Sequence, residues 1–442
     1  MNIILLSGGS GKRLWPLSDE IRSKQFLKLF QDESGKAESM IQRVYRQINM
    51  FIPNANIVIA TSRKQVGLIR EQLGENVKIC LEPDRRDTFP AIALATAFLH
   101  YELGVSDSES VVICPVDPYV DDSYFSCLYH LHELSQNGMA KIMLLGVQPT
   151  YPSEKYGYII PENADDVSKV AAFKEKPSAE AAKEYLTKNA LWNAGIFACN
   201  IQYLLNIARE QIRFADYRDL YQRYQELPKI SFDYAVVEKE KSICVLRYHG
   251  QWKDIGTWNV LAETMTCDTL GNVLLDEQCS NVSVINELDL PILCVGCRNL
   301  VVSVSNNGIL ISDKASSENI KPNIEKICAN NKTTSRTWGS FTILDVQAKS
   351  LTARLKINKQ QRLSYHSHEY RNETWTVVAG SGRAMIDGNV RSLNVGDTIL
   401  IPAGCRHMMI ADDYLSVIEI QTGDLIDVAD KTKYDIPGEN KE

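Results

Sequence analysis

Ile3–Leu17 (IILLSGGSGKRLWPL) begins as an apolar run and stops abruptly at a glycine cluster. The run Ile3–Leu6 is typical of a strand buried on both faces of a parallel sheet. Three glycines and two cations follow it, and these are Gly8, Gly9, Gly11, Lys12 and Arg13. Glycines favour a turn with positive φ and exposed amides, and exposed N–H groups beside cations predict a phosphate-binding turn. The alternative is an ordinary strand-to-helix turn with solvated cations.

Two better-known glycine motifs do not fit this turn. The Walker motif needs a glycine at Leu6 and a Ser or Thr at Arg13, and the dinucleotide fingerprint needs a glycine at Leu14. The remaining pattern, Gly-Gly-x-Gly-x-Arg-Leu-x-Pro-Leu, is followed by Ser23–Leu27 (SKQFL). It resembles the signature loop of sugar-1-phosphate nucleotidyltransferases, in particular the mannose-1-phosphate guanylyltransferase family, several members of which carry a fused type II mannose-6-phosphate isomerase domain.

Glu82–Ile92 (EPDRRDTFPAI) is similar to the family segment that lies beside the nucleotide base, Glu-Pro-x-Gly-Arg-Asn-Thr-Ala-Pro-Ala-Ile. It departs from that pattern at Arg85, Asp87 and Phe89, and the lost glycine leaves the identity of the base open. Locally, we expect Thr88 to cap a helix. The nucleotide-binding residues implied by the resemblance are Gly8, Gly9, Gly11, Lys12, Arg13, Glu82, Arg86 and Thr88.

The totals restrict the class of protein. A length of 442 residues predicts two or three domains, and 44% hydrophobic with 23% charged residues is an ordinary globular composition. The net charge of −7, from 48 basic and 55 acidic residues, argues against a general nucleic-acid surface. Eleven cysteines without repeated spacing, no leader-like start and no membrane-spanning apolar run predict a reducing, cytoplasmic location.

Apolar segments alternate with amphipathic ones after the glycine turn. Ala55–Ala60 resembles a strand, Arg63–Leu73 a helix and Val111–Cys114 a strand, which predicts a parallel α/β sheet with helices on both faces. Short pieces such as Leu300–Ser305 then indicate a β region, which in the family is a small β-helix-like connector, and the polar run 330–335 indicates a linker. We expect an α/β fold with three domains: a Rossmann-like nucleotidyltransferase domain with a mixed, mostly parallel sheet at 1–265, the connector at 266–330 and an all-β cupin domain at 335–430.

Two aspartates are candidates for a Mg²⁺ site. Asp117 follows a buried strand, at the edge where parallel sheets bind ligands, although an aspartate before a proline also suits a simple turn. Asp254 lies in Trp252–Trp258 (WKDIGTW), which resembles the family's Trp-x-Asp-Val-Gly-Ser-Trp. The resemblance implies that both carboxylates hold Mg²⁺ and that cations act on the reacting phosphates. The catalytic residues expected are Arg13, Lys24, Asp117 and Asp254.

Four further segments resemble family segments that contact the sugar phosphate: YGY at 156–158, FKEKP at 173–177, WNAGIF at 192–197 and FDYA at 232–235. Each alone is more often structural, and their order along one chain gives them weight. Carboxylate and amide groups suit a polyol because each hydroxyl both donates and accepts. The sugar-phosphate residues implied by the resemblance are Gly157, Glu175, Lys176, Asn193 and Asp233, with Lys176 on the phosphate.

The C-terminal region carries two cupin motifs. The first is His366-x-His368-x4-Glu373-x6-Gly, and the second ends at His407. By the two-residue period of a strand, His366 and His368 share a face, and we expect Glu373 and His407 on neighbouring strands. Three imidazoles and one carboxylate suit a divalent transition metal, with Zn, Mn, Fe, Ni and Co all acceptable. A metal-free cupin is the alternative.

The cupin region resembles the type II isomerase domain but departs from it near the chemistry. His366 replaces the family's glutamine ligand, and Asp427–Tyr434 replaces an arginine-bearing segment. Isomerisation needs a metal, a base for the C–H proton and a cation for the distant phosphate. Lys431, Lys433 and Arg406 are the candidates for that cation. A structural or sensory cupin is the alternative.

Together these features predict an enzyme that transfers a nucleotidyl group from an NTP to a sugar-1-phosphate and releases pyrophosphate. The resemblance implies GTP and mannose-1-phosphate as substrates, GDP-mannose as product, and mannose-6-phosphate isomerisation as a second activity to be tested. One alternative is CTP or UTP with another sugar or polyol phosphate. Another is a nucleotide-sugar-binding regulatory protein, against which the retained Lys24, Asp117 and Asp254 argue. We expect a cytoplasmic homodimer that binds neither nucleic acid nor membrane.

Overall fold

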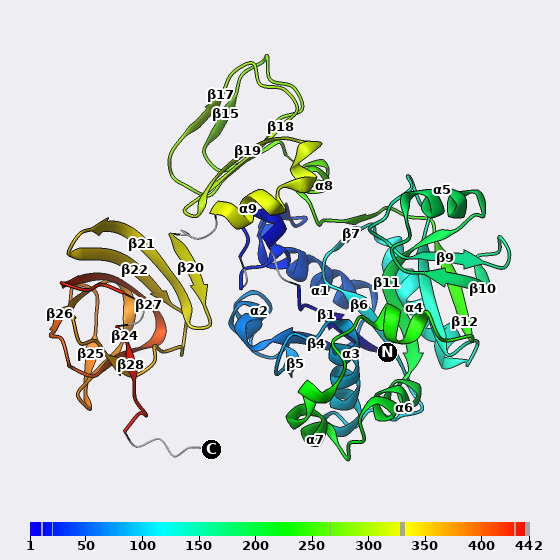
Figure 1. The fold of residues 1–442 in the computed structure, drawn as a ribbon, viewed down its shortest axis with the longest axis horizontal. Helices are drawn as coiled ribbons and strands as arrows, with labels where there is room; N and C mark the ends of the chain where they lie inside the picture. The colour runs from blue at the N-terminus through cyan, green and yellow to red at the C-terminus, as the bar shows by residue number, and fades with distance from the viewer. Residues whose placement is uncertain (10–11, 20, 266, 328–331, 428–429, 438–442) are drawn as a thin grey trace. The chain divides into compact units, whose positions relative to one another are not determined.

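The computed structural model describes residues 1–9, 12–19, 21–265, 267–327, 332–427 and 430–437 (Figure 1). The chain divides into two compact units. The first unit comprises Met1–Ser10 and Ser23–Thr266, and the second comprises Gly11–Arg22 and Cys267–Glu442. The second unit therefore includes a short N-terminal segment in addition to the connector and cupin regions. The three domain boundaries expected from the sequence stay predictions.

A mixed nine-stranded sheet forms the centre of the first unit, in the order β5-β4-β1-β6-β11-β8-β12-β10-β9. β1 pairs in parallel with both β4 and β6, whereas β10 and β11 run antiparallel to their neighbours. The predicted mixed sheet is confirmed, but it is not mostly parallel: four of its strand pairings are parallel and five are antiparallel. The strands are β1 Asn2–Leu6, β4 Asn56–Ser62, β5 Lys78–Glu82, β6 Ser110–Pro115, β8 Ile142–Val147, β9 Tyr158–Pro161, β10 Val167–Lys174, β11 Leu191–Asn200 and β12 Ile243–Tyr248.

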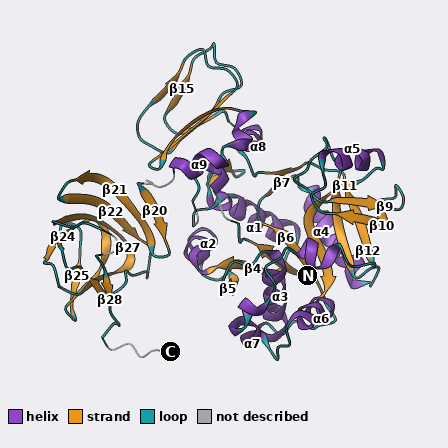
Figure 2. Cartoon of the chain, viewed as in Figure 1, coloured by secondary structure: helices purple, strands orange, loops and turns teal. Residues whose placement is uncertain are grey.

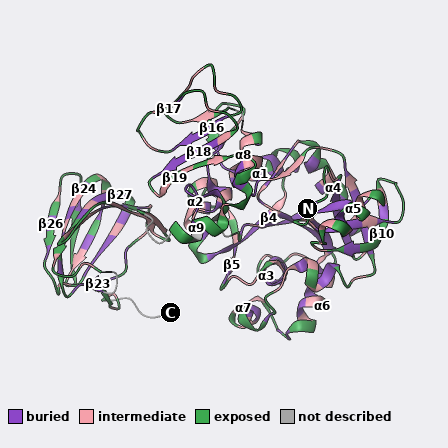
Figure 3. Cartoon of the chain, turned by 45° about the horizontal axis from the view of Figure 1, so that its top comes forward, coloured by how far each residue is buried: buried purple, intermediate pink, exposed green. Residues whose placement is uncertain are grey.

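Helices pack against this sheet in two groups, α1 with α2 and α4, and α3 with α6 and α7 (Figure 2). Consecutive residues of β1 and β6 are buried, as expected for strands covered on both faces (Figure 3). The helices of this unit are α1 Met40–Phe51, α2 Val66–Leu73, α3 Thr88–Ala97, α4 Ser123–Gln136, α5 Ala179–Thr187, α6 Ile201–Gln211, α7 Tyr217–Gln222 and α8 Trp258–Thr264. Shorter turns of helix are η2 Lys24–Phe26, η3 Arg63–Gln65, η4 Phe98–Glu102, η5 Tyr224–Glu226 and η6 Asp233–Val237.

Two small ladders lie outside the main sheet of the first unit. β2 (Phe30–Gln31) pairs with β3 (Ala37–Glu38), and β7 (Pro118–Val120) pairs antiparallel with β13 (Trp252–Asp254). In the second ladder Asp254 lies opposite Pro118. This register brings two segments that are far apart in the sequence to the edge of the sheet where β6 ends.

The connector of the second unit contains a four-stranded sheet, β14-β16-β18-β19, and a two-stranded sheet, β15-β17. Parallel pairing of β14 with β16, β16 with β18 and β15 with β17 agrees with the β-helix-like connector that the sequence predicts. Its elements are β14 Thr269–Leu270, β15 Val273–Leu275, β16 Ser283–Asn286, β17 Ile292–Cys294, β18 Leu300–Ser305, β19 Gly308–Asp313, η7 Ser316–Asn319 and α9 Lys321–Ile327, together with the N-terminal η1 Lys12–Leu14.

The C-terminal region is the predicted cupin, a curled antiparallel sheet whose longest strands are β24 and β27 (Figure 1). Buried and exposed residues alternate along β24, so one face of the sheet lines the interior (Figure 3). The strands are β20 Thr333–Arg336, β21 Gly339–Gln347, β22 Ser350–Ile357, β23 His366–Ser367, β24 Arg371–Ile386, β25 Asn389–Leu393, β26 Thr398–Ile401, β27 His407–Gly423 and β28 Thr432–Lys433.

Two local predictions are wrong. The predicted linker at 330–335 overlaps β20, because Thr333–Arg336 pairs with β21; residues 328–331 lie outside the described part. The N-cap of α3 is Asp87 rather than Thr88, because the Asp87 side chain accepts from the Thr88 N–H at 2.8 Å. Among the described helices, none is long and apolar enough to cross a membrane.

Candidate functional site

Asp117, Asp254 and Lys24 meet at the edge of the first sheet, although the two aspartates are 137 positions apart in the sequence. Asp117 lies between β6 and β7, and the pairing of β7 with β13 places Asp254 beside it. Lys24 is the first residue of η2. Its Nζ lies 2.7 Å from Asp117 Oδ2 and 3.0 Å from Asp254 Oδ1. Three of the four predicted catalytic residues therefore form one cluster.

The side chains of this cluster are partly exposed, and the charges of the two carboxylates act strongly on Lys24. The side chains of Lys24, Asp117 and Asp254 are 19%, 29% and 34% exposed. Burial alone would lower the pKa of Lys24, but the two carboxylates outweigh burial and raise it above the usual lysine range. Two carboxylates that already share one cation also suit Mg²⁺, which binds through one or two carboxylates and keeps its other positions for water and phosphate oxygens.

The glycine turn differs from its prediction in one respect. Gly8 and Gly9 are exposed, but neither adopts the left-handed conformation that we expected. Gly8 lies close to Glu82, because a Cβ on Gly8 would be in van der Waals contact with Glu82 Oε1, at 3.5 Å. Gly11 lies outside the described residues. Lys12 and Arg13 begin η1 in the second unit, so their part in phosphate binding stays a prediction.

The segment expected beside the base makes contacts within the protein. Glu82 ends β5, and its Oε2 accepts from the Tyr224 hydroxyl at 2.9 Å. Burial raises the pKa of Glu82 to about 7. Arg86 Nε donates to the Leu227 carbonyl at 3.0 Å. Three predicted nucleotide-binding residues lie in this segment, Glu82, Arg86 and Thr88. No pattern in the sequence indicated their partners, which lie at residues 224, 227 and 232.

The five residues predicted to hold the sugar phosphate gather at one end of β9, β10 and β11. A Cβ on Gly157 would lie 2.4 Å from Glu175 Oε2, so a side chain at position 157 would displace the Glu175 carboxylate. Asn193 Nδ2 donates to Asp233 Oδ1 at 2.6 Å, and Lys176 Nζ lies 3.1 Å from Glu175 Oε1. Burial raises the pKa of Asp233 to about 6, and the charge of Glu175 adds to this. Glu175 Oε2 is buried and has no hydrogen-bond partner among the described residues, so it is available to a sugar hydroxyl.

The cupin region brings its three predicted histidines together. One ring nitrogen from each of His366, His368 and His407 lies within 4.8 Å of the others, and all three residues are buried. Their Nδ1 atoms contact the backbone carbonyls of residues 364, 430 and 405. His368 Nε2 also contacts Arg371 Nη2 at 3.2 Å. Glu373 Oε1 lies 3.0 Å from His368 Nε2. The donor set fits a divalent transition metal.

Charge around the triad supports this geometry. Burial alone would raise the pKa of Glu373, but contacts with His368 and His407 lower it well below the usual carboxyl range. The neighbouring Glu419 is buried, and burial together with the charge of Glu373 raises its pKa to about 8. The site therefore combines a carboxylate held ionised with a carboxyl group held neutral.

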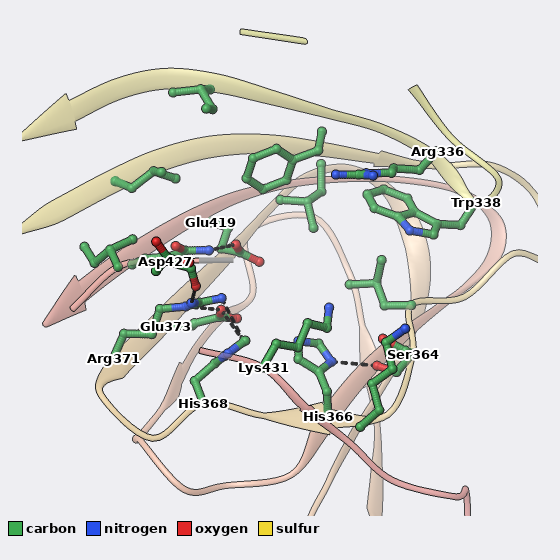
Figure 4. Close-up of a pocket in the computed structure, with 18 residues that line it drawn as sticks. Arg336, Trp338, Ser364, His366, His368, Arg371, Glu373, Glu419, Asp427 and Lys431 are labelled. Atoms are coloured by element: carbon green, nitrogen blue, oxygen red, sulfur yellow. Dashed lines mark hydrogen bonds and ion pairs between the residues drawn. The ribbon is translucent and has the colours of Figure 1, made fainter. Parts of the chain in front are cut away.

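His366 and His368 of the triad line a cavity of about 540 Å³ (Figure 4). Lys431 and Lys433 line it, and Lys431 lies beside His366 in Figure 4. Arg406 is wrong as a candidate, because its guanidinium stacks 4.1 Å from the Tyr434 ring centroid instead of lining the cavity. Arg336 lines the cavity and was missed, because a lone arginine 30 residues before the motif carries no sequence signal.

Comparisons with known proteins agree with this division. The nucleotidyl transferase model matches residues 2–269, and the mannose-6-phosphate isomerase C-terminal model matches residues 323–435. A putative mannose-1-phosphate guanylyltransferase of Vibrio cholerae is 28% identical, over 98% of this chain and 99% of its own. The mannose-1-phosphate guanylyltransferase of Escherichia coli K12 is 28% identical, over 98% and 97%. A crystal structure from Thermus thermophilus, named mannose-1-phosphate geranyltransferase, has a TM-score of 0.63 and 27% identity, over 74% of this chain and 99% of its own.

Proposed function

The chain belongs to the nucleotidyl transferase family, and from that premise we propose that it transfers a guanylyl group from GTP to mannose-1-phosphate, giving GDP-mannose and pyrophosphate. The single observation that carries the proposal is the pairing of Lys24 with both Asp117 and Asp254 at the ligand-binding edge of the sheet. Relatives named mannose-1-phosphate guanylyltransferase, aligned over almost their whole length, support the choice of substrates.

The reaction needs positioning and charge neutralisation rather than a covalent intermediate. An oxygen of the sugar-1-phosphate attacks the α-phosphorus in line, a new P–O bond forms, and the bond to pyrophosphate breaks. Asp117 and Asp254 would hold Mg²⁺, which neutralises charge on the phosphates when it is bound. Lys24 donates to the reacting phosphates, and the same role for Arg13 stays a prediction from the sequence.

The sugar side depends on the cluster around Glu175. Its unpartnered Oε2 accepts from a hydroxyl of the sugar, and Asn193 and Asp233 supply a donor and an acceptor for the ring. Lys176 neutralises the sugar phosphate; its side chain is 55% exposed and accessible to the ligand. A polyol held on several directional hydrogen bonds is thus placed with its phosphate oxygen toward the nucleotide.

Pyrophosphate release from GTP, CTP, UTP, ATP and dTTP with mannose-1-phosphate and Mg²⁺ tests this proposal. We expect GTP to be preferred at least 10-fold. Arg85, Asp87 and Phe89 depart from the family pattern beside the base, so the base is tested directly: a preference for CTP or UTP would reject guanylyl transfer and retain the reaction class. No release with any NTP would favour a regulatory protein that binds nucleotide sugars.

The cupin cavity favours a second activity, mannose-6-phosphate isomerisation. This proposal is supported by one cavity that is lined both by His366 and His368 of the triad and by four cations, Arg336, Arg371, Lys431 and Lys433. A bound metal would polarise the carbonyl, and a cation would hold the phosphate at the other end of the sugar. The type of metal, which we expect among Zn, Mn, Fe, Ni and Co, belongs to this proposal.

Conversion of fructose-6-phosphate to mannose-6-phosphate with each metal supplied tests the second activity. We expect turnover that is lost in His368→Ala and lowered at least 10-fold in Lys431→Gln. Lys349→Gln is the matched control, because Lys349 pairs with Asp424 at 2.7 Å on the exposed surface of the same region. Metal binding without turnover would instead indicate a structural or sensory cupin. The cytoplasmic location and the homodimer stay predictions, to be tested by fractionation and light scattering.

A further inference from the structure

Four hydrogen bonds join the segment after β5 to the segment between α7 and η6. We call the two segments together the clasp and define it as residues 82–89 and 224–232. Glu82 binds the Tyr224 hydroxyl at 2.9 Å, and Arg86 Nε binds the Leu227 carbonyl at 3.0 Å. The Phe89 N–H donates to the carbonyl of residue 230 at 3.2 Å. The Phe232 N–H donates to the Thr88 hydroxyl oxygen at 2.8 Å.

The clasp ends next to a residue of the sugar-phosphate cluster. Phe232 is 1% exposed and directly precedes Asp233, the first residue of η6. Its ring packs 4.9 Å from that of Phe197 on β11, the strand that also carries Asn193. Asn193 in turn donates to Asp233 at 2.6 Å. The bond to Thr88 thus fixes where the backbone begins the turn that presents Asp233.

The other end of the clasp lies at the glycine turn. Glu82 uses Oε2 for Tyr224, while its Oε1 faces Gly8. Glu82 therefore has a group directed at the expected nucleotide site. Thr88 and Arg86 differ, because Thr88 Oγ1 and Arg86 Nε are already used by the opposite segment.

We propose that Thr88 and Arg86 are positioning residues for the sugar-phosphate side of the reaction, and that they act through Asp233 rather than by binding the base. The inference rests on the proposed function for its substrates. Without the Thr88 hydroxyl, a buried N–H at Phe232 loses its acceptor, and such a group moves to find another partner. Asp233 then shifts relative to Asn193, and the sugar loses one of its contacts.

Steady-state kinetics on Thr88→Val, with the full chain, separates the two roles. We expect the KM for mannose-1-phosphate to rise about 10-fold, while the KM for the preferred NTP stays within about 2-fold. Thr88→Ser, which restores the hydroxyl, is expected to return both values to within about 2-fold of wild type. Arg86→Gln, at a partly exposed position, is expected to shift the same KM about 3-fold.

Thr96→Val is the matched control. Thr96 is a fully buried threonine on the same helix, but its hydroxyl donates to the Ile92 carbonyl within α3 at 2.7 Å. We expect both KM values to be unchanged in Thr96→Val. A rise in the NTP KM alone for Thr88→Val, or a failure of Thr88→Ser to restore the sugar KM, would overturn the proposal.

Calorimetric titration of mannose-1-phosphate into the same variants keeps this test apart from the proposed function. If wild type releases no pyrophosphate but binds the sugar phosphate, the proposed function fails, and weaker binding by Thr88→Val than by Thr96→Val still supports the positioning role. Equal binding by the two variants, or no binding by wild type, overturns it.

Discussion

The two candidate sites of this chain are built in opposite ways. The Asp117–Lys24–Asp254 cluster is 19–34% exposed, and its groups are held mainly by one another. The cupin triad is at most 4% exposed, and each imidazole is fixed by a backbone carbonyl. A site of mutual ion pairs changes when a ligand enters, whereas a site fixed by backbone contacts is organised in advance. We therefore expect the removal of one residue to have different consequences at the two sites.

The largest effect is expected at the two aspartates. Asp117→Ala or Asp254→Ala leaves Lys24 with a single carboxylate and removes a ligand for Mg²⁺, so we expect nucleotidyl transfer to fall at least 100-fold. Pyrophosphate release measures this. Turnover within 3-fold of wild type in both variants would move the reaction away from this cluster.

The preorganised site should lose metal when one imidazole is removed. His407→Ala removes one member of the buried triad, and we expect metal affinity of the cupin region to fall about 100-fold, measured by competition with a chelating dye. Nucleotidyl transfer should stay within about 2-fold, because the reaction uses the other site. Equal loss of both activities would contradict the separation of the two sites.

The exposed site should bind a divalent cation more tightly when its own cation is removed. In Lys24→Gln the two carboxylates lose their shared ammonium, so we expect Mn²⁺ to bind the nucleotide-free protein about 10-fold more tightly. Electron paramagnetic resonance of free Mn²⁺ measures this affinity. Lys253→Gln is the control, because Lys253 neighbours Asp254 but pairs with Glu263 at 3.0 Å. An unchanged Mn²⁺ affinity in Lys24→Gln would show that Lys24 does not compete for the site.

The smallest effect concerns the stability of the first unit. Burial raises the pKa of Glu82 from 4.5 to about 7, so the folded state holds this proton more tightly than the unfolded chain does. The contribution of the protonated form to stability is therefore present below pH 4.5 and is lost as the pH rises toward 7. At pH 8, ionisation of buried Glu82 therefore lowers the free energy of unfolding by about 3 kcal/mol.

Glu82→Gln should remove that pH dependence. We expect the Tm of the variant to exceed wild type by a few degrees at pH 8 and to equal it near pH 4.5. Glu71→Gln, at an exposed glutamate, should change neither value. A variant less stable than wild type at pH 8 would show that the Tyr224 bond to an ionised carboxylate outweighs its burial.

Much of the fold and the outline of both sites could be predicted because the relevant patterns are local. Ile3–Leu6 is apolar at successive positions, and it forms a strand buried on both faces. His366 and His368 are two residues apart, which puts them on one side of an extended chain. Asp117 and Asp254 each belong to a short motif, and the ladder of β7 with β13 brings the motifs together.

What could not be predicted depends on backbone atoms and on distant partners. Arg86 donates to a backbone carbonyl, and Thr88 accepts from a backbone N–H. Almost every residue has these two backbone groups, so the sequence cannot indicate which one is the partner. Arg336 lines the cupin cavity because the sheet curls, and no regular spacing in the sequence indicates this position. Asp87 rather than Thr88 caps α3, because Asp87 accepts from the Thr88 N–H, whereas the Thr88 hydroxyl accepts from the distant Phe232 N–H.

The most direct test of the central claim is identification of the product, by phosphorus NMR and mass spectrometry, from GTP, mannose-1-phosphate and Mg²⁺ with three proteins in parallel. We expect GDP-mannose from wild type and from His407→Ala at similar rates, and at least 100-fold less from Asp254→Ala. GDP-mannose from Asp254→Ala at the wild-type rate, or no nucleotide sugar from wild type, would contradict it.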